Sequence, residues 1–436
     1  MSYDIILGRD ASDKKKFGTA GLIHIGKGYV TMGNYTSMSN NIYLDVARSH
    51  VILVAGKRGS GKSYSIGVIT EEIANLPQEL ARNIAPIIFD TMGIFWTMKF
   101  KNEKDKDILN EWNLEAKESP IKVFAPIGKI EEYKEKGIPV DESFALKASE
   151  LEAEDWIITF NLLMTSQEGV LITNTISKLK QETDSFTIQD IIKQVTHTHN
   201  VSQETKNVAS SLFQAAESWG IFSKSNEGTK ITDLVNAGKT TIIDLSVYSS
   251  IGSFNVRGLV IGLVSKKLFN ERINARKKEE IQSIQHGIDY MSYNPTRENP
   301  LIWLFIDEAH EFLKKNEKTP ATDALVQILR EGRQPGISLV LATQQPGQIH
   351  NDVMTQSDIV ISHRVTSKPD IEALNQIMQS YLLESIKSSM DKLPSSKGSA
   401  IILDDNSERI YPMRMRPRLT WHGGESPSAV KGQSSL

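Results

Sequence analysis

Residues with the chemistry of a phosphate-binding loop lie together in the stretch VAGKRGSGKS, residues 54–63, which Tyr64 follows. This stretch fits the pattern G-x-x-x-x-G-K-[ST], in which backbone N–H groups point at phosphate oxygens and glycines permit a tight curve. Lys62 would contact the β- and γ-phosphates of a nucleotide, and the Ser63 hydroxyl would bind Mg²⁺. The residues predicted to bind nucleotide here are Gly56, Gly59, Ser60, Gly61, Lys62, Ser63 and Tyr64.

Two adjacent carboxylates follow an apolar run in LIWLFIDEAHEFL. An aspartate at the end of such a strand, here Asp307, would bind Mg²⁺ through water, and Glu308 would accept the proton of an attacking water. Acidic residues are also common at the start of a helix, where they need no catalytic role. His310 either links hydrolysis to the next loop or caps a helix.

Polar side chains end the next apolar run, in LVLATQQP. There the amide of Gln344 would sense the γ-phosphate or position a water molecule. Arg330 and Arg333 lie between the two runs, in LREGRQPG. An arginine supplied across a subunit boundary can stabilise charge on a transferring phosphoryl group, but the composition of this turn does not distinguish that role from a solvated helix end.

Short apolar runs separated by helical patterns predict the scaffold that carries these residues. HVILVA precedes the phosphate-binding loop, SYSIGVITEEIANL after it has helical spacing, and APIIFD is the next strand, ending at Asp90. The same character returns in KTTIIDLS, LIWLFIDE, GISLVLATQ and DIVISHRV. Strands alternating with helices predict an α/β fold with a mainly parallel sheet covered by helices.

Three flanking segments differ in composition from this core. Residues 1–49 contain β-prone runs punctuated by Gly and Asn, which predict a short N-terminal β segment. Residues 101–230 are rich in Glu and Lys and predict a mainly helical insertion, in which Ser185 would cap a helix. The Gly/Ser-rich residues 421–436 predict a flexible tail. The predicted nucleotide-binding core comprises residues 50–100 and 231–420.

Composition excludes several classes of protein. The 436 residues carry 50 basic and 53 acidic side chains, so the chain is not a globally basic nucleic-acid binder, although a local basic patch remains possible. The absence of cysteine excludes disulfides and thiolate metal sites. No apolar run approaches the ~18 residues of a spanning helix, and the N-terminus lacks a signal-peptide core. These features favour a soluble, cytoplasmic protein with no membrane contact.

Two short motifs admit other interpretations. The letters DEAH occur in two-lobed helicases, but Asp307 lies about 245 residues after Lys62 and only about 130 residues follow it, too few for a comfortable second lobe. The letters SKPD, residues 367–370, are similar to a guanine-reading loop. The leading Asn or Thr of such a loop is missing, and the acidic motif lacks the glycine of a GTPase switch.

Taken together, the motifs resemble the HerA/FtsK superfamily of ring-forming, RecA-like ATPases, and its HerA branch in particular. The similar stretches are RSHVILVAGKRGSGKS, IIFDTMGIFW, TTIIDLS, FIDEAHEFL, LREGRQPGISLVLATQQPGQI and RMRPRLTWHGG, spread over roughly residues 48–424. The resemblance implies a RecA-like P-loop NTPase core that uses ATP and Mg²⁺. It also implies a homohexamer with nucleotide between subunits and double-stranded DNA in a central channel.

The resemblance implies roles for further residues. Arg333 matches an arginine finger, and Arg48, with Arg414 or Arg416, matches additional arginines around the nucleotide. HerA-like proteins work with a NurA-type nuclease or a defence effector. The chain departs from the pattern at its N-terminus, because HerA proteins usually carry a β-barrel of around a hundred residues there and only about 48 precede the nucleotide strand. That departure puts nuclease docking in doubt.

In RecA-like rings, the loops after the catalytic and sensor strands face the channel. Here the first loop is LKKNEKTPATD and the second is QPGQIHNDVMTQ. Their residues that could contact DNA are Lys314, Lys315, Lys318, Gln348, His350 and Asn351. The lysines would track phosphates without reading sequence, or they would simply be solvated.

The sequence is thus interpreted as an ATP-driven, hexameric, double-stranded-DNA translocase of HerA type. A DNA-pumping or packaging motor on the same core is one alternative. A nucleotide-gated scaffold that assembles an effector complex without moving DNA is another.

Overall fold

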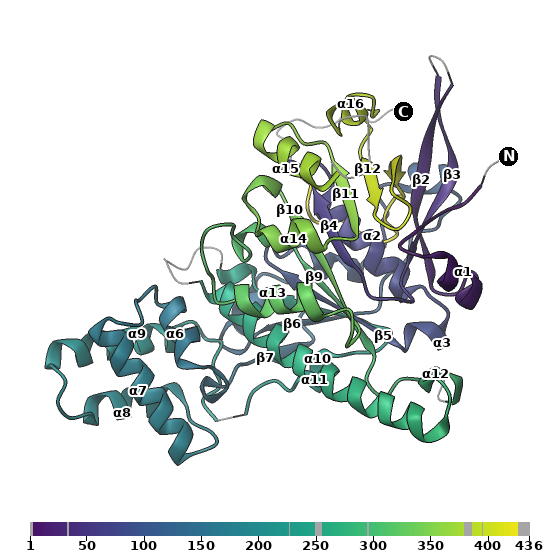
Figure 1. Ribbon diagram of the computed structural model, residues 1–436. Helices are drawn as coiled ribbons and strands as arrows, with labels where there is room; N and C mark the ends of the chain where they lie inside the picture. Colours follow the sequence, from purple (N-terminus) through teal and green to yellow (C-terminus); the bar gives the residue numbers. More distant parts are fainter. Residues whose placement is uncertain are drawn as a thin grey trace.

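A single twisted sheet runs through the protein (Figure 1). The computed structural model describes residues 3–32, 35–225, 227–248, 255–293, 296–378, 386–394 and 396–425. Its strands are β1 (Ile5–Leu7), β2 (Leu22–Met32), β3 (Tyr35–Asp45), β4 (Val51–Ala55), β5 (Ile84–Asp90), β6 (Ile121–Pro126), β7 (Glu142–Phe144), β8 (Thr240–Asp244), β9 (Leu301–Ile306), β10 (Ile337–Thr343), β11 (Ile359–His363), β12 (Ser399–Asp404) and β13 (Arg409–Met415). Within the described residues they form one 13-stranded sheet, in the order β1-β3-β2-β13-β12-β11-β4-β10-β9-β5-β8-β6-β7.

Most neighbouring strands in this sheet are parallel. All strand pairs from β11 through β4, β10, β9, β5, β8 and β6 to β7 run in the same direction. The pairs β11–β12, β12–β13, β13–β2 and β2–β3 are antiparallel, and β1 pairs with β3 in parallel. The predicted α/β fold with a mainly parallel sheet is therefore confirmed.

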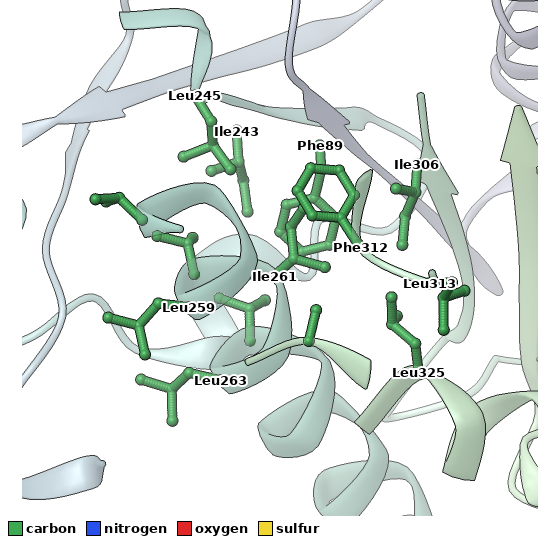
Figure 2. Packing of buried hydrophobic residues seen from close by; sticks show 14 of the residues in the cluster. Phe89, Ile243, Leu245, Leu259, Ile261, Leu263, Ile306, Phe312, Leu313 and Leu325 are labelled. Atoms are coloured by element: carbon green, nitrogen blue, oxygen red, sulfur yellow. The ribbon is translucent and has the colours of Figure 1, made fainter. Parts of the chain in front are cut away.

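The central strands are mainly apolar because both faces of the sheet are buried. Successive residues of β9 point to opposite faces, so Trp303 and Phe305 join one hydrophobic cluster and Leu304 and Ile306 join the other. The first cluster packs against the helix that follows the phosphate-binding loop. Figure 2 shows the second, in which strand residues meet the long helix α11. The residues labelled there are Phe89, Ile243, Leu245, Leu259, Ile261, Leu263, Ile306, Phe312, Leu313 and Leu325.

Sixteen α-helices accompany the sheet in the described residues. They are α1 (Ala11–Phe17), α2 (Lys62–Ala74), α3 (Gln78–Ala81), α4 (Lys106–Glu111), α5 (Ile130–Glu135), α6 (Ala153–Thr159), α7 (Gln167–Glu182), α8 (Ile188–His197), α9 (Gln203–Ser218), α10 (Ile231–Leu234), α11 (Val256–His286), α12 (Tyr290–Tyr293), α13 (Thr322–Glu331), α14 (Asn351–Gln356), α15 (Lys368–Met378) and α16 (Ile386–Asp391). None of these helices is both long and apolar enough to cross a membrane.

The helical insertion is narrower than the predicted range of 101–230. Its helices α6 to α9 lie together at one end of the molecule (Figure 1), but β6 and β7, also within that range, pair with the main sheet. The predicted cap at Ser185 is wrong. Thr187 caps α8 instead, because its hydroxyl accepts from the Asp190 amide while the Asp190 carboxylate accepts from the Thr187 amide.

The N-terminal segment extends the main sheet. Strand β2 pairs with β13, so residues from the two ends of the described chain are neighbours. A cluster of ion pairs connects this segment to the core. In this cluster His50 lies 2.6 Å from Asp358 and 3.5 Å from Asp45. Arg9 also pairs with Asp45. Although burial opposes its charge, these carboxylates raise the pKa of His50 to about 9. Most of the predicted tail, residues 426–436, lies outside the described residues.

Candidate nucleotide-binding and catalytic site

The predicted site residues meet at one edge of the sheet because their strands are adjacent. Strand β10 lies between β4 and β9 and is parallel to both. The carboxyl ends of parallel strands share one edge, which is where ligands bind in open α/β sheets. The loop after β4, the acidic pair after β9 and Gln344 after β10 are thereby brought together, although they lie up to about 290 residues apart.

The loop after β4 has the backbone that its glycines predicted. Gly59 and Gly61 have positive φ angles of 73° and 112°, which disfavour any residue with a side chain. A Cβ on Gly56 would lie 2.8 Å from the Cβ of His363, so that close approach also favours glycine. Helix α2 begins at Lys62, and the partial positive charge of its N-terminus faces the loop.

Lys62 is buried within this loop, only 5% exposed. Its ammonium group donates to the Lys57 carbonyl oxygen at 3.3 Å, which closes the loop on itself. Burial lowers the pKa of Lys62, and the nearby carboxylates of Glu308 and Asp307 partly offset that effect. The positive charge thus lies near two carboxylates, in the loop where it could bind phosphate oxygens.

The hydroxyl of Ser63 donates to Oδ2 of Asp307 at 2.5 Å. Asp307 is fully buried, and burial raises the pKa of its carboxyl, with the charge of Glu308 acting in the same direction. Oxygen donors of this kind suit Mg²⁺, which prefers one or two protein oxygens together with waters and nucleotide phosphates. The residues present therefore fit the predicted magnesium site, with Ser63 as a ligand and Asp307 acting through water.

Glu308 has an unusual backbone and one free carboxylate oxygen. Its φ of 53° lies in the left-handed region, which costs a residue with a side chain about 1–3 kcal/mol and is typical of functional sites. Its Oε1 accepts a hydrogen bond from the Gln344 amide. Oε2 is buried and has no hydrogen-bond partner among the described residues, with Nδ1 of His310 3.6 Å away. A carboxylate oxygen held in this way is available to accept a proton from water.

His310 connects the two catalytic strands. Its Nδ1 lies 3.3 Å from the hydroxyl oxygen of Thr343, at the end of β10. It therefore lies near both Glu308, after β9, and Thr343, at the end of β10. It also belongs to a short 3-10 helix, η5 (Ala309–Glu311), whose N-cap residue is Glu308.

Arg333 lies at the opposite edge of the sheet. It follows α13 and precedes β10, whose seven residues span about 23 Å at roughly 3.3 Å per residue, and Gln344 follows the far end of that strand. It is exposed and, with Arg48, lines a cavity of about 750 Å³ at the amino ends of the central strands. Arg330 is engaged elsewhere, because its Nε lies 2.8 Å from Oδ2 of Asp352. Arg333 cannot reach the phosphate-binding loop of its own chain.

The other predicted arginines contact protein groups away from the loop. Arg48 pairs with Asp13 at 2.8 Å, and Nε of Arg414 donates to the Lys397 carbonyl at 3.3 Å. Arg416 is fully buried and pairs with Glu71 at 3.0 Å. Glu71 lies nine residues after Lys62, roughly 13 Å along α2, so this structure gives Arg416 a structural role and no place at the phosphates of its own chain.

Tyr64 contacts the C-terminal segment. Its hydroxyl accepts from the Arg418 amide at 2.7 Å, and its ring meets His422 edge-on at 5.3 Å between centroids. Arg418 is fully buried and donates to Glu71 at 3.1 Å. The segment that carries these residues therefore packs along α2. Sequence reasoning missed this role of Arg418, since a buried arginine gives no periodic signal.

The two candidate DNA loops contact one another. The Lys315 amide donates to the Gln348 carbonyl at 3.0 Å, and the His350 amide donates to the Leu313 carbonyl at 2.8 Å. Lys314 pairs with Glu317 at 2.6 Å. Lys318 pairs with Asp323 at 3.1 Å, and both pairs are exposed. The loops thus form one surface that continues from Glu308 and Gln344, with part of its positive charge already neutralised.

Comparison with known proteins places this site in a family. A family model described as Helicase HerA, central domain, matches residues 30–260, and one described as Zonular occludens toxin (Zot) matches residues 239–368. The DNA double-strand break repair helicase HerA of Saccharolobus solfataricus is 24% identical over 83% of this chain and 62% of its own length. That of Pyrococcus furiosus is 27% identical over 32% of this chain and 24% of its own length. The chain thus covers less than two thirds of these relatives.

A solved structure shares the fold. VirB4 of Thermoanaerobacter pseudethanolicus superposes with a TM-score of 0.53 at 13% identity, covering 91% of this chain and 96% of that one. At this identity the likeness concerns the fold alone. The HerA model, in contrast, covers more than half of the chain and includes the phosphate-binding loop. On that basis the chain belongs to the family described as Helicase HerA, central domain.

Proposed function

We propose that the chain is an ATP-driven double-stranded-DNA translocase of HerA type that works as a homohexamer. The observation that supports this proposal is the placement of the predicted site residues at two opposite edges of the sheet. Lys62, Ser63, Asp307, Glu308 and Gln344 lie together at the carboxyl edge of the sheet, whereas Arg333 lies at the amino edge, at the other end of a strand that spans about 23 Å. A head-to-tail ring would bring the two edges of neighbouring subunits together.

In this proposal ATP binds between subunits. The loop amides and Lys62 would hold the β- and γ-phosphates, and Ser63, together with Asp307 through water, would hold the Mg²⁺. Bound Mg²⁺ would neutralise charge on the phosphate oxygens. Glu308 orients a water molecule and accepts its proton, and Gln344, already bonded to Glu308, fixes the direction of that carboxylate.

The neighbouring subunit would complete the site. Its Arg333 stabilises the charge that develops during phosphoryl transfer, a contribution of the arginine-finger kind. Arg48 lines the same cavity, so it is the second candidate for a contact with the neighbour's nucleotide, although its pair with Asp13 must then be shared or broken. Arg414 and Arg416 are weaker candidates, given their present partners.

DNA contact is assigned to the joined loops after η5 and β10. Lys315 and its neighbours would track the phosphate backbone without reading bases, and binding would weaken steeply with salt. The first loop follows η5, which begins directly after Glu308, and the second follows β10 and Gln344, so each loop is close in the chain to a proposed catalytic residue. A nuclease or defence effector as a partner rests on family resemblance alone.

A roadblock assay tests the proposal. A protein tightly bound to one end of a duplex should be displaced by the wild-type chain with ATP and Mg²⁺, and Lys62→Ala serves as the control that lacks the phosphate contact. Negative-stain imaging of the same samples should show six-fold rings. Displacement without ATP, or ATP hydrolysis without any movement of DNA, would contradict translocation. ATP-dependent assembly with an effector and no movement would support the scaffold function instead.

A further inference from the structure

His363 packs against the phosphate-binding loop, next to Gly56 and Gly61. It is the last residue of β11, which pairs with β4, so its side chain emerges at the edge where the loop begins. A Cβ on Gly56 would lie 2.8 Å from the Cβ of His363, and one on Gly61 would lie 3.5 Å from its Cε1. The imidazole is fully buried and fills the space under both ends of the loop.

Both nitrogens of this imidazole have partners. Nδ1 lies 3.1 Å from the Ser399 carbonyl oxygen, and Nε2 lies 2.8 Å from the Ser65 hydroxyl oxygen. A carbonyl oxygen can only accept, so Nδ1 carries the proton and Nε2 accepts from Ser65. Burial lowers the pKa of His363 to about 4, which keeps the ring neutral at pH 7 and preserves this pattern.

Ser65 is part of the first turn of α2, two residues after Ser63, and is fully buried. At the other end of the loop, the Lys57 amide donates to the carbonyl of Arg364, the residue after His363, at 3.1 Å. The end of β11 therefore holds the loop at its start and at its finish. A shift of either contact would change the direction of the loop amides relative to the helix.

From these contacts we propose that His363 is a positioning residue for the phosphate-binding loop. Its neutral imidazole accepts from Ser65 and fixes the first turn of α2 against β11, so that Lys62, Ser63 and the loop amides converge on one phosphate group. The inference rests on the proposed use of ATP, and it adds a residue that touches neither the nucleotide nor the reacting water. The hydrogen bond between Ser65 and His363 is stabilising because both side chains are buried, and a buried hydroxyl without a partner destabilises the folded state.

Two amide substitutions separate this role from simple packing. In His363→Gln the side-chain oxygen can reach the position of Nε2 and keep the bond to Ser65, while the bond to Ser399 is lost. In His363→Asn the side-chain nitrogen can take the position of Nδ1 and keep the bond to Ser399, while the bond to Ser65 is lost. Both variants are neutral and smaller than histidine, so they form a matched pair.

The measurement is the Kd of a non-hydrolysable ATP analogue with Mg²⁺, together with kcat at saturating ATP. We expect His363→Asn and Ser65→Ala each to weaken analogue binding by roughly three- to tenfold, the value of one buried hydrogen bond. His363→Gln should bind nearly as wild type does. The double variant His363→Asn with Ser65→Ala should be no weaker than either single variant, because both changes remove the same bond.

Opposite results would overturn the assignment. If His363→Asn binds the analogue as wild type does and His363→Gln does not, the residue serves only to join β11 to β12. If His363→Asn does not fold, Ser65→Ala decides, since alanine is well tolerated in a helix, and unchanged analogue binding in that variant refutes the proposal. A wild-type chain that binds no analogue would refute the proposed ATP use and this inference with it.

Discussion

Replacing Arg333 by alanine tests whether two subunits share each active site. Arg333 precedes β10, a strand that spans about 23 Å, and so lies beyond the reach of its own phosphate-binding loop at the other end of that strand. If the arginine acts on a neighbour's nucleotide, Arg333→Ala should lower kcat by ~10³–10⁵, equivalent to about 4–7 kcal/mol of transition-state stabilisation. ATP affinity should change much less, because the charge develops during transfer. Arg330→Ala is the matched control. Because Arg330 already pairs with Asp352, this variant should have a kcat close to that of wild type.

A mixing experiment gives the decisive magnitude. Lys62→Ala and Arg333→Ala are each expected to be inactive, but an interface is complete where an Arg333→Ala subunit presents its loop to a Lys62→Ala neighbour. In randomly mixed rings at equal amounts, about one quarter of interfaces have this order, so hydrolysis should recover to at most about a quarter of wild type. The assay is steady-state phosphate release, with tag pull-down to establish subunit exchange.

A titration of wild type with Lys62→Ala completes the design, because it shows whether a ring tolerates an inactive site. If that titration falls gradually and subunits exchange, yet the two inactive variants recover nothing at any ratio, the shared-site reasoning is refuted. Wild-type turnover by Arg333→Ala alone would refute it equally.

Three further predictions concern the base, pH and DNA. Glu308→Gln should retain ATP binding and lose about 10²–10⁴ in kcat, because an amide cannot accept the proton; near-normal phosphate release would place the base elsewhere. The pKa of His50 is raised to about 9 in the folded protein, against 6.5 in the unfolded chain. Protonated His50 therefore stabilises the folded state by about 3 kcal/mol, an effect that is complete below about pH 6.5 and is lost as the pH rises through 9. The free energy of unfolding, measured with denaturant at pH 6 and pH 9.5, checks this prediction. If His50→Gln loses as much of that free energy between the two pH values as wild type does, the pH dependence belongs to other groups. Lys315→Ala should reduce the salt slope of duplex binding by about one, and Lys314→Ala by less because Glu317 pairs with it, whereas two unchanged slopes would move the DNA contact off this loop.

The central part of the fold could be predicted because its strands are short apolar runs that end in chemically distinctive residues. A buried parallel strand such as β9 reads as a continuous apolar run, and Asp307 marks its carboxyl end. Adjacent placement of the loop, the acidic pair and Gln344 follows from parallel strands sharing an edge. The left-handed backbone of Glu308 could not be predicted from the sequence, because glutamate rarely adopts this conformation and only the surrounding fold enforces it.

Other features depended on pairing between distant segments. Strands β6 and β7 lie in a Glu- and Lys-rich region with helical patterns on both sides. The composition of that region therefore did not predict that these two strands belong to the sheet. The role of Arg416 was missed for a related reason. Its motif suggested a nucleotide contact, but Glu71 on α2, about 345 residues earlier, binds its guanidinium, and a single sequence does not reveal such pairs.

The position of β4 in the sheet has a consequence for how the chain folds during synthesis. Both sheet neighbours of β4, β10 and β11, begin about 290 to 310 residues after it, so the strand that carries the phosphate-binding loop leaves the ribosome early and is paired late. At about 5–20 residues per second, roughly 15 to 60 seconds of translation separate the two events. During that interval the apolar sequence of β4 has no native strand partner, so assembly of the proposed nucleotide site is a late step in folding.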